Sequence, residues 1–331
     1  MIEKENKIIE ILADALFKDE NIVMPEPIIK IYNKIVATSQ NAICISGLPK
    51  SRKTTFTSYF IASALKGQPV FNIDVKLAPD EKIILIDTEQ SLYDFSKQMN
   101  FLKYNLKVKK LPVNFSAYLF RKYEPDVILS SVYNLMKVQQ PKILILDNAT
   151  ELVINPNDMT ESKKLIQFIK LITAEFNCVV ICLLHLSKSN LQTLGNIGSY
   201  MDRMAQSTLK VTLDKESGTS TLEPQLMRSD SFFKPISIGY NEDTKNYEQV
   251  EHEQDRPKTS RKFILMNITP DEHINRLNAI FFTKKSYEYN ELVEEIKKIY
   301  GVGTNISKQQ IIPYLRGNNF LKQDKNNNYI L

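Results

Sequence analysis

Cysteine is scarce in this chain, since its 331 residues include only Cys44, Cys178 and Cys182. All three lie in apolar segments that we predict to be buried strands, where cysteine packs as a small apolar residue. Neither a disulfide framework nor a cysteine metal site is therefore indicated. The chain also lacks an apolar run of about 18 residues, the length that a membrane-spanning helix needs. Its charged N-terminus is unlike a signal peptide, so we expect a cytoplasmic protein with no membrane partner.

A strong charge imbalance is missing too. The net charge is +5, from 43 lysines and arginines against 38 acidic residues. This balance permits binding to nucleic acid but does not require it. Hydrophobic residues make up 43% and charged residues 24%, as in ordinary globular proteins. The length predicts two domains, of which the first is large enough for a substantial core.

A phosphate-binding loop is the most informative motif present. An apolar run leads into Gly47, and Lys53 and Thr54 follow at the spacing of G-x-x-x-x-G-K-[ST]. Backbone N–H groups of such loops face phosphates, the lysine contacts the β- and γ-phosphates, and the threonine hydroxyl binds Mg²⁺. Thr55 is a weaker candidate for the metal. We expect these residues to line the nucleotide site: Gly47, Pro49, Lys50, Ser51, Arg52, Lys53, Thr54 and Thr55.

The second glycine of the motif is replaced by Arg52. Glycine tolerates positive φ and leaves no side chain against the phosphate. An arginine there must strain the backbone, shift the loop, or point its guanidinium outward or at a phosphate. Nucleotide hydrolysis therefore has to be argued from further residues.

Acidic residues end two predicted buried strands. Residues 82–87 and 142–147 are aliphatic runs typical of parallel strands, and they end in Asp87 and Asp147. Asp147 can hold Mg²⁺ through water, the Walker B role. Glu89, just after the first run, has the reach to orient the attacking water, with Asp87 as the next candidate.

A further predicted strand, residues 178–184, ends in His185. The carboxyl end of a strand is the ligand side of doubly wound sheets, so His185 could sense a γ-phosphate. A lone histidine can equally be a structural residue, and the sequence does not choose between these roles.

The ordered motifs resemble the RecA-like P-loop ATPases, and within them the RepA/DnaB-type replicative helicases of plasmids and mobile elements. The similar segments are the loop, Ile-Asp-Thr-Glu, Ile-Leu-Asp-Asn, Leu-Leu-His-Leu-Ser-Lys, and the stretches 195–211 and 219–228. The resemblance implies an α/β fold whose mostly parallel sheet lies between helices. It implies that Glu89 is the catalytic carboxylate and His185 the sensor. Arg228, or less readily Arg203, would be an arginine finger that reaches a neighbouring subunit.

Four segments are expected along the chain: an N-terminal helix in 1–24, the ATPase domain in 25–240, a polar linker in 241–269 and a small domain in 270–331. Helical periodicity in the last segment covers 270–282, 289–300 and 306–317, and 321–331 could form a hairpin. This pattern resembles a winged helix-turn-helix. Its third helix carries residue types that reach bases and phosphates, namely Lys308, Gln309, Gln310 and Arg316. Protein docking or a structural cap are the alternatives.

The sequence thus favours a DNA-associated, ATP-hydrolysing motor, a helicase or helicase loader, with ATP and Mg²⁺ as ligands. A finger acting between subunits implies a homo-oligomer such as a hexameric ring, with single- or double-stranded DNA as partner. Arg52 leaves two alternatives open. One is a DNA-binding regulator with a degenerate nucleotide site, and the other is a filament-forming recombination mediator.

Overall fold

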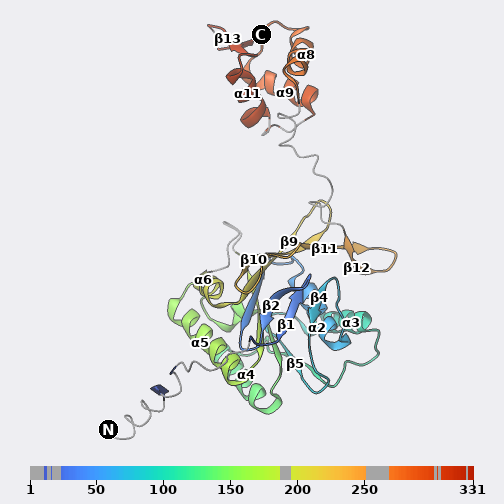
Figure 1. Cartoon of the computed structure of the whole chain (residues 1–331), viewed down its shortest axis with the longest axis vertical. Coiled ribbons are helices and arrows are strands. Elements are labelled where there is room, and N and C mark those ends of the chain that lie inside the picture. Colours follow the sequence, from blue (N-terminus) through green and yellow to red (C-terminus); the bar gives the residue numbers. More distant parts are fainter. Residues whose placement is uncertain are drawn as a thin grey trace. The chain divides into compact units, whose positions relative to one another are not determined.

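A nine-stranded sheet forms the centre of the first of two units into which the chain divides, residues 1–250 and 251–331 (Figure 1). The computed structural model describes residues 11, 12, 16, 24–186, 195–250, 268–301, 304, 307–325 and 327–331. In spatial order the strands are β12 (Asn246–Val250), β11 (Ile236–Asn241), β10 (Ser220–Met227), β9 (Ser207–Leu213), β3 (Ala42–Gly47), β8 (Val179–His185), β7 (Ile143–Asp147), β5 (Ile83–Asp87) and β6 (Phe115–Leu119).

The six strands from β9 to β6 are parallel, and β10, β11 and β12 extend the sheet in antiparallel fashion. Every residue of β3, β5 and β7 is buried. Their aliphatic runs suit strands that are covered on both faces. The mostly parallel sheet between helices that the sequence predicts is therefore confirmed.

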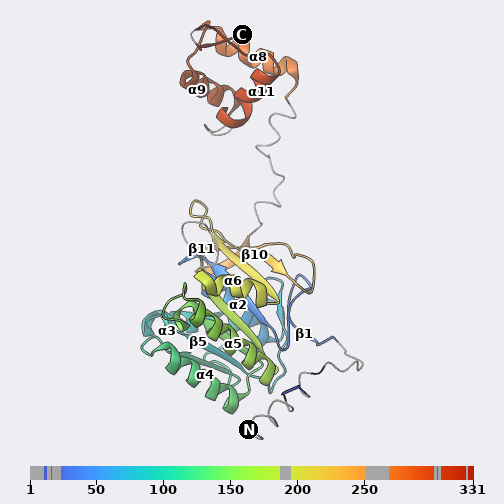
Figure 2. The same ribbon diagram turned by 90° about the vertical axis from the view of Figure 1, so that its left-hand side faces the viewer.

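Helices cover both faces of this sheet (Figures 1 and 2). One core contains Ile43 and Ile45 of β3 together with apolar residues of α2 (Lys53–Lys66) and α3 (Leu92–Leu106). The other contains Cys44 together with residues of α4 (Pro125–Gln139), α5 (Met159–Glu175) and α6 (Gly195–Met204). Successive residues of β3 thus enter opposite cores, as strand geometry requires. A small sheet of β2 (Lys34–Thr38), β1 (Pro27–Ile31) and β4 (Ile73–Val75) adds to the first core.

The three cysteines are free and buried, which confirms the prediction that they pack as apolar residues. Among the described residues, no helix has the length and apolar character needed to cross a membrane.

Residues 241–250, which the sequence assigns to the linker, belong instead to the sheet. There β12 pairs with β11 from Asn246 opposite Asn241 to Val250 opposite Ser237. The segment is polar because β12 is an edge strand whose side chains are largely exposed or half-buried. Residues 251–267 of the expected linker, with Lys258, Arg261 and Lys262, lie outside the described residues, as does nearly all of the expected N-terminal helix.

The second unit has its own hydrophobic core, formed by residues such as Leu277, Ile296 and Leu315. Its elements are α8 (Pro270–Phe281), α9 (Tyr289–Tyr300), a π-helical turn η2 (Ser307–Ile311), α11 (Ile312–Gly317), and a hairpin of β13 (Lys322–Gln323) and β14 (Tyr329–Ile330). The single third helix expected over 306–317 is divided. Pro313 lies in the first turn of α11, where its missing N–H costs no helical hydrogen bond.

Candidate functional site

The loop between β3 and α2 lies at the carboxyl edge of the parallel strands. Its backbone has positive φ at Lys50 (66°) and Arg52 (75°). Phe56 N–H donates to the Arg52 carbonyl at 3.1 Å, the first hydrogen bond of α2. The N–H groups of Lys53 to Thr55 precede this bond, so they have no partner within the helix and can receive an anion.

Gly47 is required by the close packing of this loop. A Cβ there would lie 2.5 Å from Ser51 Oγ and 2.7 Å from the Val211 carbonyl oxygen. Ser51 is only 2% exposed, and its Oγ has no hydrogen-bond partner among the described residues. The loop therefore holds a buried hydroxyl that can still donate to a ligand.

Arg52 keeps the left-handed backbone that the missing glycine would adopt, and its guanidinium points outward. Nη1 donates to the Gly218 carbonyl oxygen and, at 3.2 Å, to Ser220 Oγ. The guanidinium carbon lies 4.7 Å from the centre of the Tyr247 ring on β12. Left-handed backbone costs roughly 1–2 kcal/mol in a residue other than glycine. A cation–π contact and two hydrogen bonds offset a cost of this size.

Lys53, His185 and Glu89 form a chain of contacts across the site. Lys53 Nζ donates to the Gly47 and Leu48 carbonyl oxygens at 3.0 and 3.2 Å and lies 3.3 Å from His185 Nδ1. His185 Nε2 lies 3.3 Å from Glu89 Oε2. An ammonium group can only donate, so Nδ1 accepts and the proton of the neutral ring sits on Nε2, facing Glu89.

The pKa values of two members of this chain of contacts, Glu89 and Lys53, are lowered. The hydrogen bond from His185 lowers the pKa of Glu89, which keeps that carboxylate charged. Burial lowers the pKa of Lys53, and the nearby Asp147 and Glu89 carboxylates oppose that shift.

Thr54 and Asp147 supply two oxygens at the base of the loop. Thr54 Oγ1 donates to Asp147 Oδ2 at 2.9 Å, whereas Thr55 makes no such contact among the described residues. Burial and the nearby Asp87 carboxylate raise the pKa of Asp147 to about 7. Within the described parts of the chain, no cluster of three or more His, Cys, Asp or Glu side chains could hold a metal unaided.

Asp87 is buried and fully engaged. Its Oδ1 accepts from the N–H groups of Glu89 and Gln90, and its Oδ2 accepts from Gln90 Nε2 at 2.6 Å. Burial raises the pKa of Asp87. These contacts make Asp87 an organiser of the turn that presents Glu89, and a poor alternative to Glu89 itself.

Three residues at the site have no role predicted from the sequence, namely Asn148, Thr88 and Tyr247. Asn148 Nδ2 lies 3.5 Å from Glu89 Oε2, and the Asn148 backbone exchanges two hydrogen bonds of 3.0 Å with the Thr88 hydroxyl. Asn148 and Thr88 each directly follow an aspartate that ends a strand, and this position could have marked them in the sequence. No sequence pattern marks Tyr247, because its segment has the composition of a polar linker.

The two candidate finger arginines lie together at the other end of the strands. Arg228 Nη2 donates to the Arg203 carbonyl oxygen at 2.9 Å. Arg228 directly follows Met227, the last residue of β10, and Met227 pairs with Ser207 at the start of β9. The phosphate loop begins further along β9, where Gly47 pairs with Val211. Neither arginine can therefore serve the site of its own chain.

The second unit brings two of its four predicted basic and polar residues to one hollow of about 460 Å³. Lys308 Nζ lies 5.7 Å from the ring centre of Tyr289, and the Arg316 guanidinium lies 5.9 Å from that of Tyr329. The neighbouring Gln309 and Gln310 are exposed.

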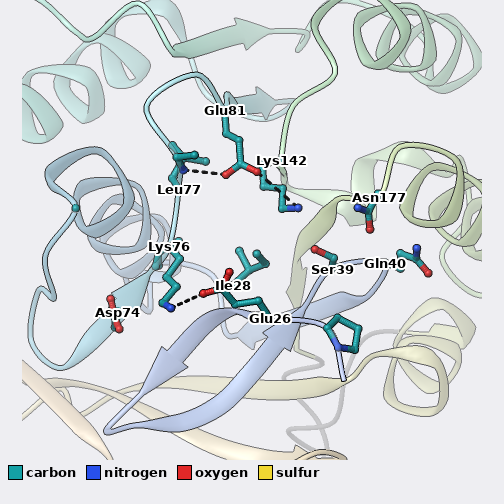
Figure 3. Close-up of a pocket in the computed structure, with 14 residues that line it drawn as sticks. Glu26, Ile28, Ser39, Gln40, Asp74, Lys76, Leu77, Glu81, Lys142 and Asn177 are labelled. Carbon is teal, nitrogen blue, oxygen red and sulfur yellow. Dashed lines mark hydrogen bonds and ion pairs between the residues drawn. The ribbon is translucent and has the colours of Figure 1, made fainter. Parts of the chain in front are cut away.

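A hollow of about 830 Å³ lies at the opposite, amino edge of the parallel strands (Figure 3). It is lined by residues that precede strands, such as Gln40 before β3 and Lys142 before β7. Its lining contains two ion pairs, Lys76 with Glu26 at 2.5 Å and Lys142 with Glu81 at 3.7 Å. It holds none of the residues of the phosphate loop, so it is separate from the candidate site.

No protein-family model and no curated protein matches the chain. One similar solved structure is a KaiC-like protein from the hyperthermophilic archaeon Pyrococcus horikoshii, which is 14% identical. The match covers 65% of this chain and 91% of that one, with a TM-score of 0.46. A likeness at this level says nothing about function.

Proposed function

We propose that this chain binds MgATP at the loop between β3 and α2 and hydrolyses it. One observation carries the proposal. Lys53 and Thr54 of the loop are in direct contact with His185 and Asp147, and through His185 with Glu89, each from the carboxyl end of a separate strand. A surface Gly…Lys-Thr sequence that arose by chance would not assemble these partners.

The loop residues fit a triphosphate. The N–H groups of the first turn of α2 can donate to phosphate oxygens, as can the Ser51 hydroxyl, which has no partner in the described part of the chain. Lys53 is buried at 7% exposure, so its charge acts with little screening by water. Its present partners are backbone carbonyls and His185, which a phosphate oxygen can replace.

Thr54 and Asp147 fit a magnesium ion that is shared with phosphates. Mg²⁺ in such sites takes one or two protein oxygens and fills its remaining positions with phosphate and water. When bound, the ion neutralises charge that develops on the transferred phosphoryl group. Thr54 and Asp147 hold their oxygens 2.9 Å apart at the foot of the loop, as this role requires.

Glu89 is the residue placed to accept a proton from the attacking water. Its carboxylate is half exposed, charged, and oriented by His185 and Asn148. His185 also contacts Lys53, so a movement of Lys53 on binding phosphate would change the position of His185 and with it that of the Glu89 carboxylate. A positioned base contributes typically ~10²–10⁴-fold to the rate.

At a finer level, we propose a DNA-associated motor of the RepA/DnaB type that works as a homo-oligomer. Arg228 supports this, because its side chain is exposed and lies at the wrong end of the strands for its own site, so it would have to act on another subunit. The second unit supports DNA contact, since its helical elements and hairpin present Lys308 and Arg316 at one hollow. Docking of a protein on that unit is the alternative.

An ATPase assay with and without single-stranded DNA tests this function. We expect magnesium-dependent turnover that Lys53→Ala abolishes and DNA stimulates. Tight ATP binding without turnover in the wild type would favour a regulator that only binds nucleotide. Absence of both binding and turnover would overturn the proposal.

A further inference from the structure

A basic hollow lies where α2, α3 and the β11–β12 turn meet, with a volume of about 580 Å³. Four of its lining residues are lysines: Lys66, Lys103, Lys107 and Lys109. Since α2 begins at the phosphate loop and reaches the hollow after 14 residues, about 20 Å separates the two sites. The hollow also belongs to the first unit, so it is independent of Lys308 and Arg316.

The charged side chains that line this hollow are all positive. No described carboxylate lines it, and none of its four lysines forms an ion pair with another described residue. Lys66 and Lys103 lie in the last turns of their helices, where cations favour the helix dipole. That explanation does not extend to Lys109, which follows the helix.

One further group in the hollow suits a nucleotide chain. Tyr104 is 59% exposed, which leaves its ring available for stacking. Lysines that track phosphates beside an aromatic ring are the combination by which proteins hold single strands.

We propose that this hollow binds a segment of single-stranded nucleic acid, with phosphates on the lysines and one base on Tyr104. A concave site with an aromatic wall fits a flexible polyanion better than the flat surface of an anionic membrane. This binding needs neither nucleotide hydrolysis nor the second unit. It can therefore fail while the ATPase proposal holds, and it is tested without nucleotide.

The test is fluorescence anisotropy of a labelled oligodeoxythymidine over a salt series, with the full chain. Neutralising two lysines, in Lys103→Gln with Lys107→Gln, should weaken binding and flatten the log–log salt slope by about 1.4 units, at ~0.7 per phosphate contact on a single strand. The matched control is Lys163→Gln with Lys170→Gln on α5, two exposed lysines outside the hollow. We expect the control to bind like the wild type.

Variants of Tyr104 distinguish the stacking of a base from the contacts of lysines with phosphates. Tyr104→Ala should weaken binding about 5- to 150-fold without changing the slope, and Tyr104→Phe should retain wild-type affinity. Thermal unfolding of every variant verifies that the fold is intact. Wild-type affinity and slope in the double lysine variant would overturn the proposal, as would an equal loss in the α5 control. The proposal would also be overturned if the protein did not bind the oligonucleotide but bound phosphatidylserine vesicles through the same lysines.

Discussion

Arg52 shows how a residue that departs from a motif can leave the geometry of the motif intact. Its backbone stays left-handed at φ 75°, while its side chain is held by Gly218, Ser220 and Tyr247. We expect Arg52→Gly to change ATP affinity less than about fivefold, because the guanidinium is engaged away from the first turn of α2. Calorimetry with Mg²⁺ measures this, with Lys53→Ala as the variant that loses binding. Strong weakening in Arg52→Gly would show that the guanidinium is a phosphate ligand.

Variants of Glu89 and Asp147 should distinguish the loss of the catalytic base from the loss of a metal ligand. Glu89→Gln keeps the shape and the contact with His185 but removes the base, so turnover should fall by ~10²–10⁴ while ATP binding stays near normal. Asp147→Asn should in addition raise the Mg²⁺ concentration that activity requires. Steady-state kinetics and nucleotide binding distinguish the two. Wild-type turnover in Glu89→Gln would place the base elsewhere.

We expect the stability of the second unit to depend on pH through His273. It is fully buried on Tyr300, Tyr314 and Phe320, with Nδ1 2.9 Å from the Tyr300 hydroxyl and Nε2 unpaired among the described residues. Burial, helped by Arg276, lowers the pKa of His273 below 6.5. The unfolded chain then binds the proton more readily, so stability present above pH 6.5 is lost as the pH falls through the lowered pKa.

Hydrogen exchange of the full chain, corrected for the intrinsic pH dependence of exchange, measures this effect in residues 268–331. Protection there should decrease between about pH 7 and pH 5 more than in β3 or β7. His273→Phe, which cannot titrate, is the control and should remove most of the difference. Equal pH dependence in wild type and His273→Phe would contradict the prediction.

At the scale of elements, β12 pairs with β11 through its backbone and packs on the first core through Tyr247. The Tyr247 ring lies 6.2 Å from that of Phe101 and 5.3 Å from that of Tyr240, and Arg52 lies over it. We expect Tyr247→Ala to lower the free energy of unfolding by about 1–3 kcal/mol. Denaturant unfolding measures this. Tyr93→Ala, which removes a 70% exposed ring from α3, should cost less than about 0.5 kcal/mol.

The sequence predicted elements well where burial dominates and poorly where it does not. The strands that end in Asp87, Asp147 and His185 are aliphatic runs, and each was located within about one residue of its bounds. The edge strand β12 was missed, since an edge strand with polar faces has the composition of a linker. The same limit hid the contact of Arg52 with Tyr247, because pairing between distant segments leaves no local pattern.

For the whole molecule, the two units have separate cores, so they should be separable. Deletion of residues 270–331 should leave the first unit folded and able to bind nucleotide. It should weaken DNA binding and flatten the salt slope by about 0.7–0.9 unit for each phosphate that the second unit binds. Anisotropy on full-length and truncated protein tests this. An unchanged slope with altered oligomerisation would indicate that the second unit docks a protein instead.

The contact between Arg52 and Tyr247 also has an evolutionary consequence. A chain with glycine at position 52 would have no need of an aromatic ring at position 247, whereas an arginine in left-handed backbone without that ring would cost stability. The two positions should therefore have changed together, with the ring arriving first as a permissive step. Among homologous sequences we expect arginine at position 52 to be accompanied by tyrosine, phenylalanine or tryptophan at position 247, and glycine at position 52 to carry no such restriction.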